Sequence, residues 1–195
     1  MKLLGTAIGG LIAAIVSVNE ALAASPHMKT SGLSSQPVGH FVYCKTYTND
    51  CRMQTLSPKV PALTEERWNE LKQINAFSNT SVKPYTDFQI YNEEEVWAYP
   101  NNYGDCEDYV LMKRKLLMDR GWPASSLLIT VVRRPNGEGH AVLTVRTDRA
   151  DFIMDNLVDE IHPWYRTPYQ YLKRQSERHS GRWIDIKDTR AAQSS

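Results

Sequence analysis

Two stretches of the chain repeat apolar residues at helical intervals. In residues 64–77, Trp68, Leu71, Ile74 and Phe77 recur at three-residue steps, and two glutamates occupy the first turn. The positive end of the helix dipole favours anions there, so this pattern predicts a helix.

The second helical pattern begins after Gly104 and ends before Gly121. Its apolar positions are Val110, Leu111, Leu117 and Met118. We expect the charged run at residues 113–115 to form the solvated face of this helix. Cys106 falls in the first turn.

The C-terminal half shows the patterns of strands and a turn. Residues 127–132 form a β-branched run, residues 135–139 hold turn-forming Pro, Asn and Gly, and residues 140–145 are again apolar with alternation. This order predicts a β-hairpin, and residues 152–155 predict a third strand.

The remaining segments carry weaker patterns. Residues 24–40 are rich in Ser, Pro, Gly and Lys, so we expect a flexible lead-in. Residues 79–103 mix prolines with aromatic residues and predict a long ordered connection or short strands. We expect a helix near residues 168–175 and a fourth strand at residues 183–186. Together, these predicted helices and strands indicate one α+β domain over residues 41–190.

The first 23 residues have the features of a secretory signal peptide. Lys2 gives a positive start, residues 3–18 are apolar, and Ala21-Leu22-Ala23 supplies the small residues that signal peptidase recognises. An uncleaved membrane anchor is the alternative, because the apolar run approaches membrane-spanning length. The glycines in the run favour cleavage, so we expect a periplasmic or secreted protein without stable membrane insertion.

Length and charge narrow the class of protein. The chain has 195 residues, 42% hydrophobic and 23% charged, which excludes a disordered chain and a multi-span membrane protein. Lys and Arg number 23 and Asp and Glu 22, which leaves a net charge of +1. A phosphate-binding surface needs a larger basic excess, so we expect no nucleic-acid partner.

The three cysteines divide into a pair and a single residue. Cys44 and Cys51 lie seven positions apart in a polar segment, and an oxidising compartment would let them close a small disulfide loop. Cys106 is then left over. A leftover thiol in an exported protein indicates a nucleophile or an intermolecular bridge, and burial as a small apolar residue is the simpler alternative.

Cys106 has neighbours that act in opposite directions on its thiol. A helix N-terminus lowers the pKa of a cysteine, because unpaired backbone N–H groups point at the sulfur. Asp105, Glu107 and Asp108 raise it, because their charges disfavour a thiolate. A cation, an imidazolium or an outward orientation of these carboxylates must offset them.

His140 and Asp155 are candidate partners of this thiol. His140 begins a strand directly after the glycine-rich turn at residues 137–139, which gives its ring room to approach another element. Asp155 ends the next strand, where an antiparallel neighbour brings a carboxylate to the imidazole and orients it. Each residue alone has an ordinary explanation, as a surface histidine or a turn former.

The three motifs in this order resemble a known family. The segments GDCEDY at 104–109, GHAVL at 139–143 and DNL at 155–157 are similar to motifs of the bacterial transglutaminase-like cysteine proteinases, over roughly residues 41–175. That family has a papain-like core and includes periplasmic proteases that release large adhesins from the cell surface. The resemblance implies an α+β, transglutaminase-like core with the nucleophile at a helix N-terminus packed on an antiparallel sheet.

The resemblance also implies roles for single residues. Cys106 matches the nucleophile, His140 the base and Asp155 the residue that orients the base. The adhesin-releasing members bind calcium through acidic residues beside the nucleophile, which match Asp105 and Glu107. Capping of the helix N-terminus by these two carboxylates is the alternative.

These observations predict an exported cysteine protease with calcium as its expected cofactor. Its substrate would be a protein or peptide, with a cell-surface protein as one candidate. A transglutaminase-like transamidase would use the same residues with an amine in place of water. A non-catalytic periplasmic protein-binding module would keep the arrangement without turnover. The sequence leaves both alternatives open.

Overall fold

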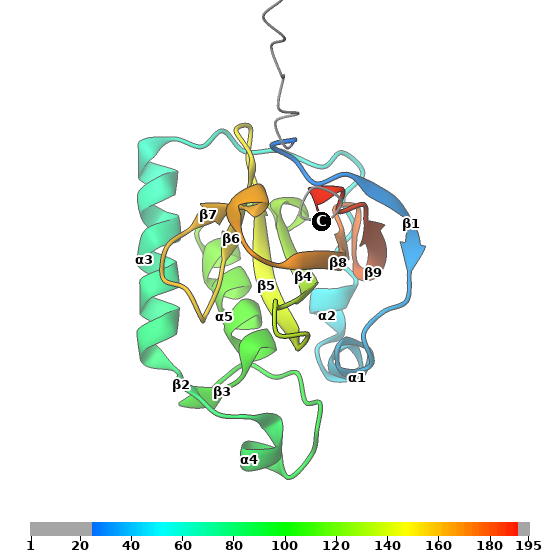
Figure 1. Cartoon of the computed structure of the whole chain (residues 1–195), viewed down its shortest axis with the longest axis vertical. Coiled ribbons are helices and arrows are strands. Elements are labelled where there is room, and N and C mark those ends of the chain that lie inside the picture. Colours follow the sequence, from blue (N-terminus) through cyan, green and yellow to red (C-terminus); the bar gives the residue numbers. More distant parts are fainter. Residues whose placement is uncertain (1–24, 191–195) are drawn as a thin grey trace, which may run out of the picture.

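The protein is built on one antiparallel sheet with helices packed against it (Figure 1). The computed structural model describes residues 25–190, so the predicted signal peptide, residues 1–23, lies outside the described residues. The sheet has seven strands in the order β1-β9-β8-β4-β5-β6-β7. These are β1 (Thr30–Ser34), β4 (Leu127–Arg133), β5 (Gly139–Arg146), β6 (Asp151–Met154), β7 (His162–Pro163), β8 (Gln170–Ser176) and β9 (His179–Ile186).

The α-helices of residues 25–190 are α1 (Val38–Thr46), α2 (Thr48–Cys51), α3 (Glu65–Ser81), α4 (Asp87–Tyr91) and α5 (Cys106–Asp119). In Figure 1, α5 lies against the sheet with α3 beside it, and α1, α2 and α4 lie toward the lower end of the molecule. α5 packs against β5 and β4, and α3 packs against α5. Two short strands, β2 (Lys83–Pro84) and β3 (Tyr103–Gly104), pair in parallel within the connection that precedes α5. Within residues 25–190, no helix is both long and apolar enough to cross a membrane.

Both predicted helices are confirmed, with small changes at their ends. The Thr64 side chain caps α3 by accepting a hydrogen bond from the Arg67 N–H (3.2 Å), and Leu71 and Ile74 are buried. α5 ends shortly before Gly121, whose φ of +83° suits glycine and stops the helix.

The predicted hairpin and third strand are also confirmed, and they fix two side chains of interest. β4 and β5 pair in a register that sets Val132 opposite His140. β5 pairs in turn with β6, with Leu143 opposite Met154. His140 and Asp155 therefore stand at the same end of two neighbouring strands.

The segment near residues 168–175, predicted to be a helix, is the inner strand β8. That prediction was wrong. Leu, Lys, Arg and Gln in this segment favour a helix in isolation. Pairing with β4 on one side and β9 on the other, together with burial of Tyr171 and Arg174, outweighs that preference.

Regular structure begins earlier than the expected lead-in suggests. Residues 30–34 form the edge strand β1, which pairs with β9, and α1 starts at Val38. The sequence of this strand, TSGLS, has no apolar alternation. Hydrogen bonds to the sheet edge order it, and composition does not reveal them.

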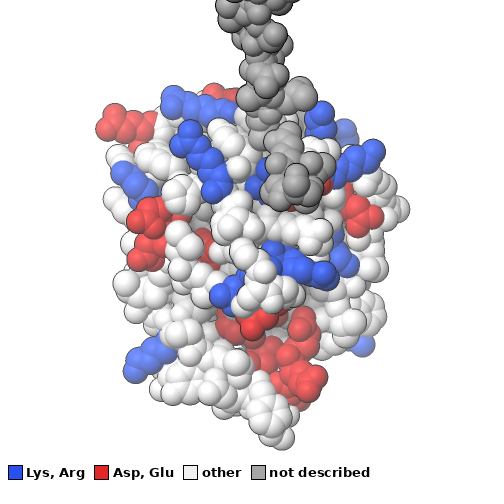
Figure 2. Space-filling model, in the orientation of Figure 1, with Lys and Arg blue, Asp and Glu red and all other residues white. Residues whose placement is uncertain are grey.

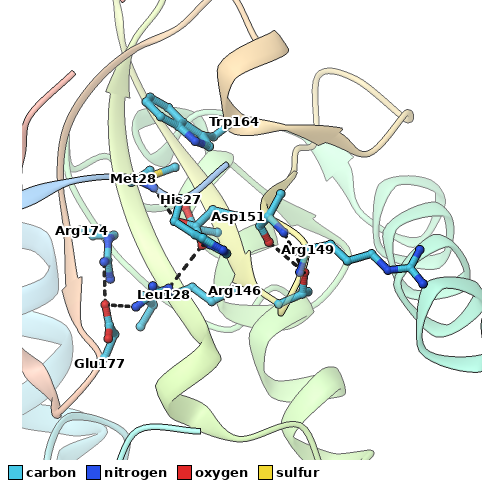
Figure 3. Close-up of polar contacts among 12 residues, drawn as sticks. His27, Met28, Leu128, Arg146, Arg149, Asp151, Trp164, Arg174 and Glu177 are labelled. Carbon is cyan, nitrogen blue, oxygen red and sulfur yellow. Dashed lines mark hydrogen bonds and ion pairs between the residues drawn. The ribbon is translucent and has the colours of Figure 1, made fainter. Parts of the chain in front are cut away.

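Asp151 connects the segment before β1 to the sheet through hydrogen bonds (Figure 3). Its carboxylate accepts a hydrogen bond from the Met28 N–H (2.9 Å) and lies 3.1 Å from His27 Nδ1. The Asp151 N–H donates to the Pro26 carbonyl (3.0 Å). Asp151 is fully buried, and Arg146 contacts it from β5. The N-terminal segment is thus tied to β6.

The two cysteines of the polar segment form a disulfide. Cys44 in α1 is bonded to Cys51 in α2, and Cys106 is the free cysteine of the described chain. The predicted pairing is confirmed.

Candidate active site

The first turn of α5 carries Cys106 to a cleft of about 320 Å³. The helix starts there because Asp105 is extended (φ −106°, ψ −165°). Gly104 lets the chain approach Asp108 closely, since a Cβ at position 104 would lie 2.8 Å from Asp108 Cβ. His140 lines the same cleft, so the structure brings together the thiol and the imidazole that the sequence singled out.

His140 and Asp155 form a buried, hydrogen-bonded pair. His140 Nε2 lies 2.8 Å from Asp155 Oδ1, and both side chains are 4% exposed. Burial acts to raise the pKa of Asp155, but the hydrogen bond and the charge of His140 outweigh it and hold that pKa below its usual range. Across residues 25–190, His140 Nδ1 has no hydrogen-bond partner, so this nitrogen can serve a group in the cleft.

Two further donors hold the Asp155 carboxylate. The Leu157 N–H donates to Oδ1 (3.0 Å) and the Tyr169 hydroxyl donates to Oδ2 (2.5 Å). The Tyr169 ring also packs on the His140 ring, with 5.6 Å between centroids. Tyr169 was not among the predicted site residues, because it stands just before β8, the strand predicted as a helix.

The thiol of Cys106 points at a carboxylate. Its Sγ donates a hydrogen bond to Glu107 Oε2 (2.6 Å). Burial raises the pKa of Cys106 well above its usual value, and the charge of Glu107 adds to the effect. The Ala141 N–H, next to His140, acts in the opposite direction on this pKa. The acidic neighbours therefore disfavour the thiolate when nothing compensates them.

An acidic cluster lies beside the thiol. Asp87, Asp105 and Glu107 each have a carboxylate oxygen within 4.8 Å of the others. Burial, followed by the charge of Glu107, raises the pKa of Asp105 to about 9. Three buried oxygens in this region have no hydrogen-bond partner among residues 25–190: Asp87 Oδ1, Asp105 Oδ1 and Asp108 Oδ2. Asp87 was not among the predicted residues, because it lies in the segment 79–103, which was expected to be a connection, and no local pattern links it to Asp105 and Glu107.

The walls of the cleft are partly charged. Glu95, Trp97, Val131 and Lys173 are among the residues that line it, and the Trp97 Nε1–H donates to Glu95 Oε1 (2.9 Å). Figure 2 shows acidic side chains gathered on the viewed face of the molecule, toward the end where α4 lies in Figure 1. The arrangement favours a cation or a positively charged group at this end.

Comparisons with known proteins show the family and the fold of the chain. The model of a family described as "Bacterial transglutaminase-like cysteine proteinase BTLCP" matches residues 30–191. No curated protein sequence matches the chain.

Solved structures of Legionella pneumophila LapG have a similar fold. One is 24% identical to this chain, covers 64% of this chain and 71% of its own length, and has a TM-score of 0.52. Calcium-bound Legionella pneumophila LapG is 20% identical, with 77% of this chain and 81% of that chain covered and a TM-score of 0.52. At these identities the likeness shows the shared fold, which is the expected α+β, transglutaminase-like core.

Proposed function

Because the chain belongs to the bacterial transglutaminase-like cysteine proteinases, we propose that it hydrolyses a peptide bond in a protein or peptide substrate. In this proposal Cys106 is the nucleophile, His140 the base and Asp155 the residue that orients the base. The observation that carries it is the buried His140–Asp155 pair, because His140 lines the same cleft as Cys106. In triad-type nucleophilic catalysis, a base next to the nucleophile accepts its proton, and a third group orients the base.

The contacts of His140 indicate which ring nitrogen acts as the general base. Its Nε2–H donates to Asp155, so Nδ1 is the nitrogen that accepts the proton of the Cys106 thiol. The thiolate then attacks the scissile carbonyl carbon and forms a tetrahedral oxyanion, toward which the Cys106 backbone N–H is a suitable donor.

Collapse of this intermediate breaks the C–N bond. The His140 imidazolium gives its proton to the leaving amine, and an acyl-enzyme remains on Cys106. Water attacks the acyl-enzyme after His140 Nδ1 accepts one of its protons. The C–S bond then breaks, the His140 imidazolium returns its proton to the Cys106 sulfur, and the carboxylic acid product leaves.

We also propose that Asp87, Asp105 and Glu107 bind calcium. Hard carboxylate oxygens suit this ion, and the buried oxygens without partners in the cluster are ready ligands. The capping alternative is less favoured, since Asp105 makes no side-chain capping hydrogen bond. A similar structure is described as calcium-bound. When bound, calcium would supply positive charge next to the thiol.

Export completes the proposal. The signal-like residues 1–23 would be removed, and the Cys44–Cys51 disulfide suits an oxidising compartment. A protein at the cell surface is then a substrate that the enzyme would meet.

The test uses the protein expressed as the full chain, incubated with a peptide library in the presence of calcium. Mass spectrometry identifies the new peptide ends. Cys106→Ala should abolish cleavage, and His140→Ala should slow it by about 10²-fold or more. His162→Ala is the matched control, because His162 is exposed on β7 and lies outside the cleft.

Two outcomes would redirect the proposal. Cleavage that persists in Cys106→Ala would exclude Cys106 as the nucleophile. Products that carry an added primary amine, and not a new carboxylate, would assign the chain to the transamidase alternative.

A further inference from the structure

We propose that Tyr169 is a positioning residue of this active site, whose hydroxyl fixes the Asp155 carboxylate so that one oxygen faces His140 throughout the reaction. The inference rests on the proposed function, because it gives Tyr169 a part in the same chemistry. It starts from the unequal contacts of the two carboxylate oxygens of Asp155.

Asp155 Oδ1 has two donors, while Oδ2 depends on one. Oδ1 lies 2.8 Å from His140 Nε2 and accepts from the Leu157 N–H at 3.0 Å. Among the described residues, the hydrogen-bond partner of Oδ2 is Tyr169 alone, at 2.5 Å. The torsion that turns an aspartate carboxylate is soft, so a donor on each oxygen is needed to hold its plane. Tyr169 supplies the donor on the second oxygen.

The Asp155 carboxylate and the Tyr169 hydroxyl are largely shielded from bulk solvent, although both residues line a cavity of about 190 Å³. Asp155 is 3% exposed and Tyr169 is 7% exposed. A buried carboxylate oxygen that loses its donor must find another or turn toward one. Burial, and then the hydrogen bond to Asp155, raises the pKa of Tyr169 above its usual range, which favours the phenol as a donor.

Tyr169 is itself held at both ends. Its ring packs on His140 at 5.6 Å, with an angle of 60° between the ring planes. Its carbonyl accepts a hydrogen bond from Arg190 Nη2 (2.6 Å), and the same nitrogen of Arg190 lies 2.7 Å from Asp188 Oδ2. The hydroxyl is therefore presented from a fixed position.

Tyr171, two residues after Tyr169 and within β8, offers a matched comparison. It is 2% exposed, and its hydroxyl lies 2.8 Å from Thr167 Oγ1. No hydrogen bond joins it to His140 or Asp155 within residues 25–190. The Tyr171→Phe substitution thus removes a buried hydroxyl without removing the hydrogen bond to Asp155, and it serves as the control.

The experiment compares Tyr169→Phe with Tyr171→Phe in the full chain. The probe is a fluorogenic peptide made from the sequence that the wild-type enzyme cleaves best in the library. Tyr169→Phe should lower kcat roughly tenfold with KM within about twofold of wild type, because an orienting contact acts on the reacting groups and not on substrate binding. Tyr171→Phe should leave kcat unchanged.

A second readout follows the tautomer of His140 by ¹⁵N NMR. Wild type should hold the proton on Nε2, and Tyr169→Phe should show a mixture of the two tautomers. Unchanged kcat together with an unchanged tautomer would overturn the inference. Equal losses in Tyr169→Phe and Tyr171→Phe would overturn it as well, since they would indicate a packing effect.

Two further results keep the test decisive. If wild type shows no Cys106-dependent cleavage, the proposed function fails, while the tautomer comparison still decides whether Tyr169 orients the pair. If Tyr169→Phe does not fold, Arg190→Gln carries the test, because it releases the Tyr169 backbone and leaves the hydroxyl. A drop in kcat with mixed tautomers supports the inference, and wild-type values of both reject it.

Discussion

Replacement of Lys113 by methionine is predicted to stabilise the protein. The Lys113 side chain lies in α5 at 0% exposure, and within the described residues its Nζ has no hydrogen-bond partner. Burial lowers the pKa of Lys113 to about 7, against the attraction of Asp155 and Asp159. Methionine has a similar shape and no charge, so the substitution removes the cost of burying an ammonium group.

The magnitude and the pH dependence follow from this pKa. The folded value of about 7 lies below the ordinary value of 10.5. This difference sets an upper limit of about 5 kcal/mol on the loss of stability that the buried lysine causes below pH 7. From pH 7 to 10.5 the unfolded state of wild type binds more protons at this lysine than the folded state. Its free energy of unfolding therefore rises with pH in this window. The variant should lack that contribution.

Urea unfolding at pH 6 and at pH 10 measures the effect. We expect Lys113→Met to gain about 1–4 kcal/mol at pH 6 and much less at pH 10. Lys115→Met is the control, because Lys115 is 52% exposed on the same helix and pairs with Asp119 at the surface. Its effect should stay within about 0.5 kcal/mol at both pH values. A Lys113→Met variant that is less stable than wild type at pH 6 would refute the reasoning.

Three further predictions concern calcium, the N-terminal segment and the disulfide. Calcium at a hundred times its Kd should stabilise the folded state by about 2.7 kcal/mol in thermal melts, and Asp87→Asn should remove most of this gain; identical melts with calcium and with chelator would leave the site without support. Asp151→Asn should lower the free energy of unfolding by about 2 kcal/mol in urea, because His27 and Arg146 lose a charged partner, whereas exposed Asp119→Asn should change little. Reduction of the Cys44–Cys51 bridge should cost about 2.5 kcal/mol for so short a loop, and a double Cys→Ala variant that matches the oxidised protein would contradict this.

The local parts of the fold could be predicted from the sequence. The helix that carries Cys106 and the hairpin that carries His140 have strong periodicity and clear stop signals, and the structure has both. Cys106, His140 and Asp155 stood out because each marks the border of such an element. Candidate functional residues at the ends of helices and strands can therefore be located from the sequence pattern.

The missed features depend on contacts between distant segments. β8 is a strand because it lies between β4 and β9, and its own sequence favours a helix. The charged run at residues 113–115 was expected to face solvent, but Lys113 and Arg114 are buried, and Arg114 Nε donates to the Leu127 carbonyl (3.0 Å). Asp87 reaches the acidic cluster only through the fold of the connection before α5. No local pattern records any of these three outcomes.

The pairing of β1 with β9 sets the order in which the chain can fold. Thr30 lies opposite Ile186, and the Lys187 N–H donates to the Lys29 carbonyl (2.8 Å), so the edge of the sheet joins the two ends of the described chain. Contacts so far apart in sequence form slowly, and this edge cannot close until residue 187 has been synthesised. Until β1 and β9 pair, each of them has an open row of backbone donors and acceptors. A fragment without residues 25–34 should therefore associate through β9, either with a second copy or into aggregates.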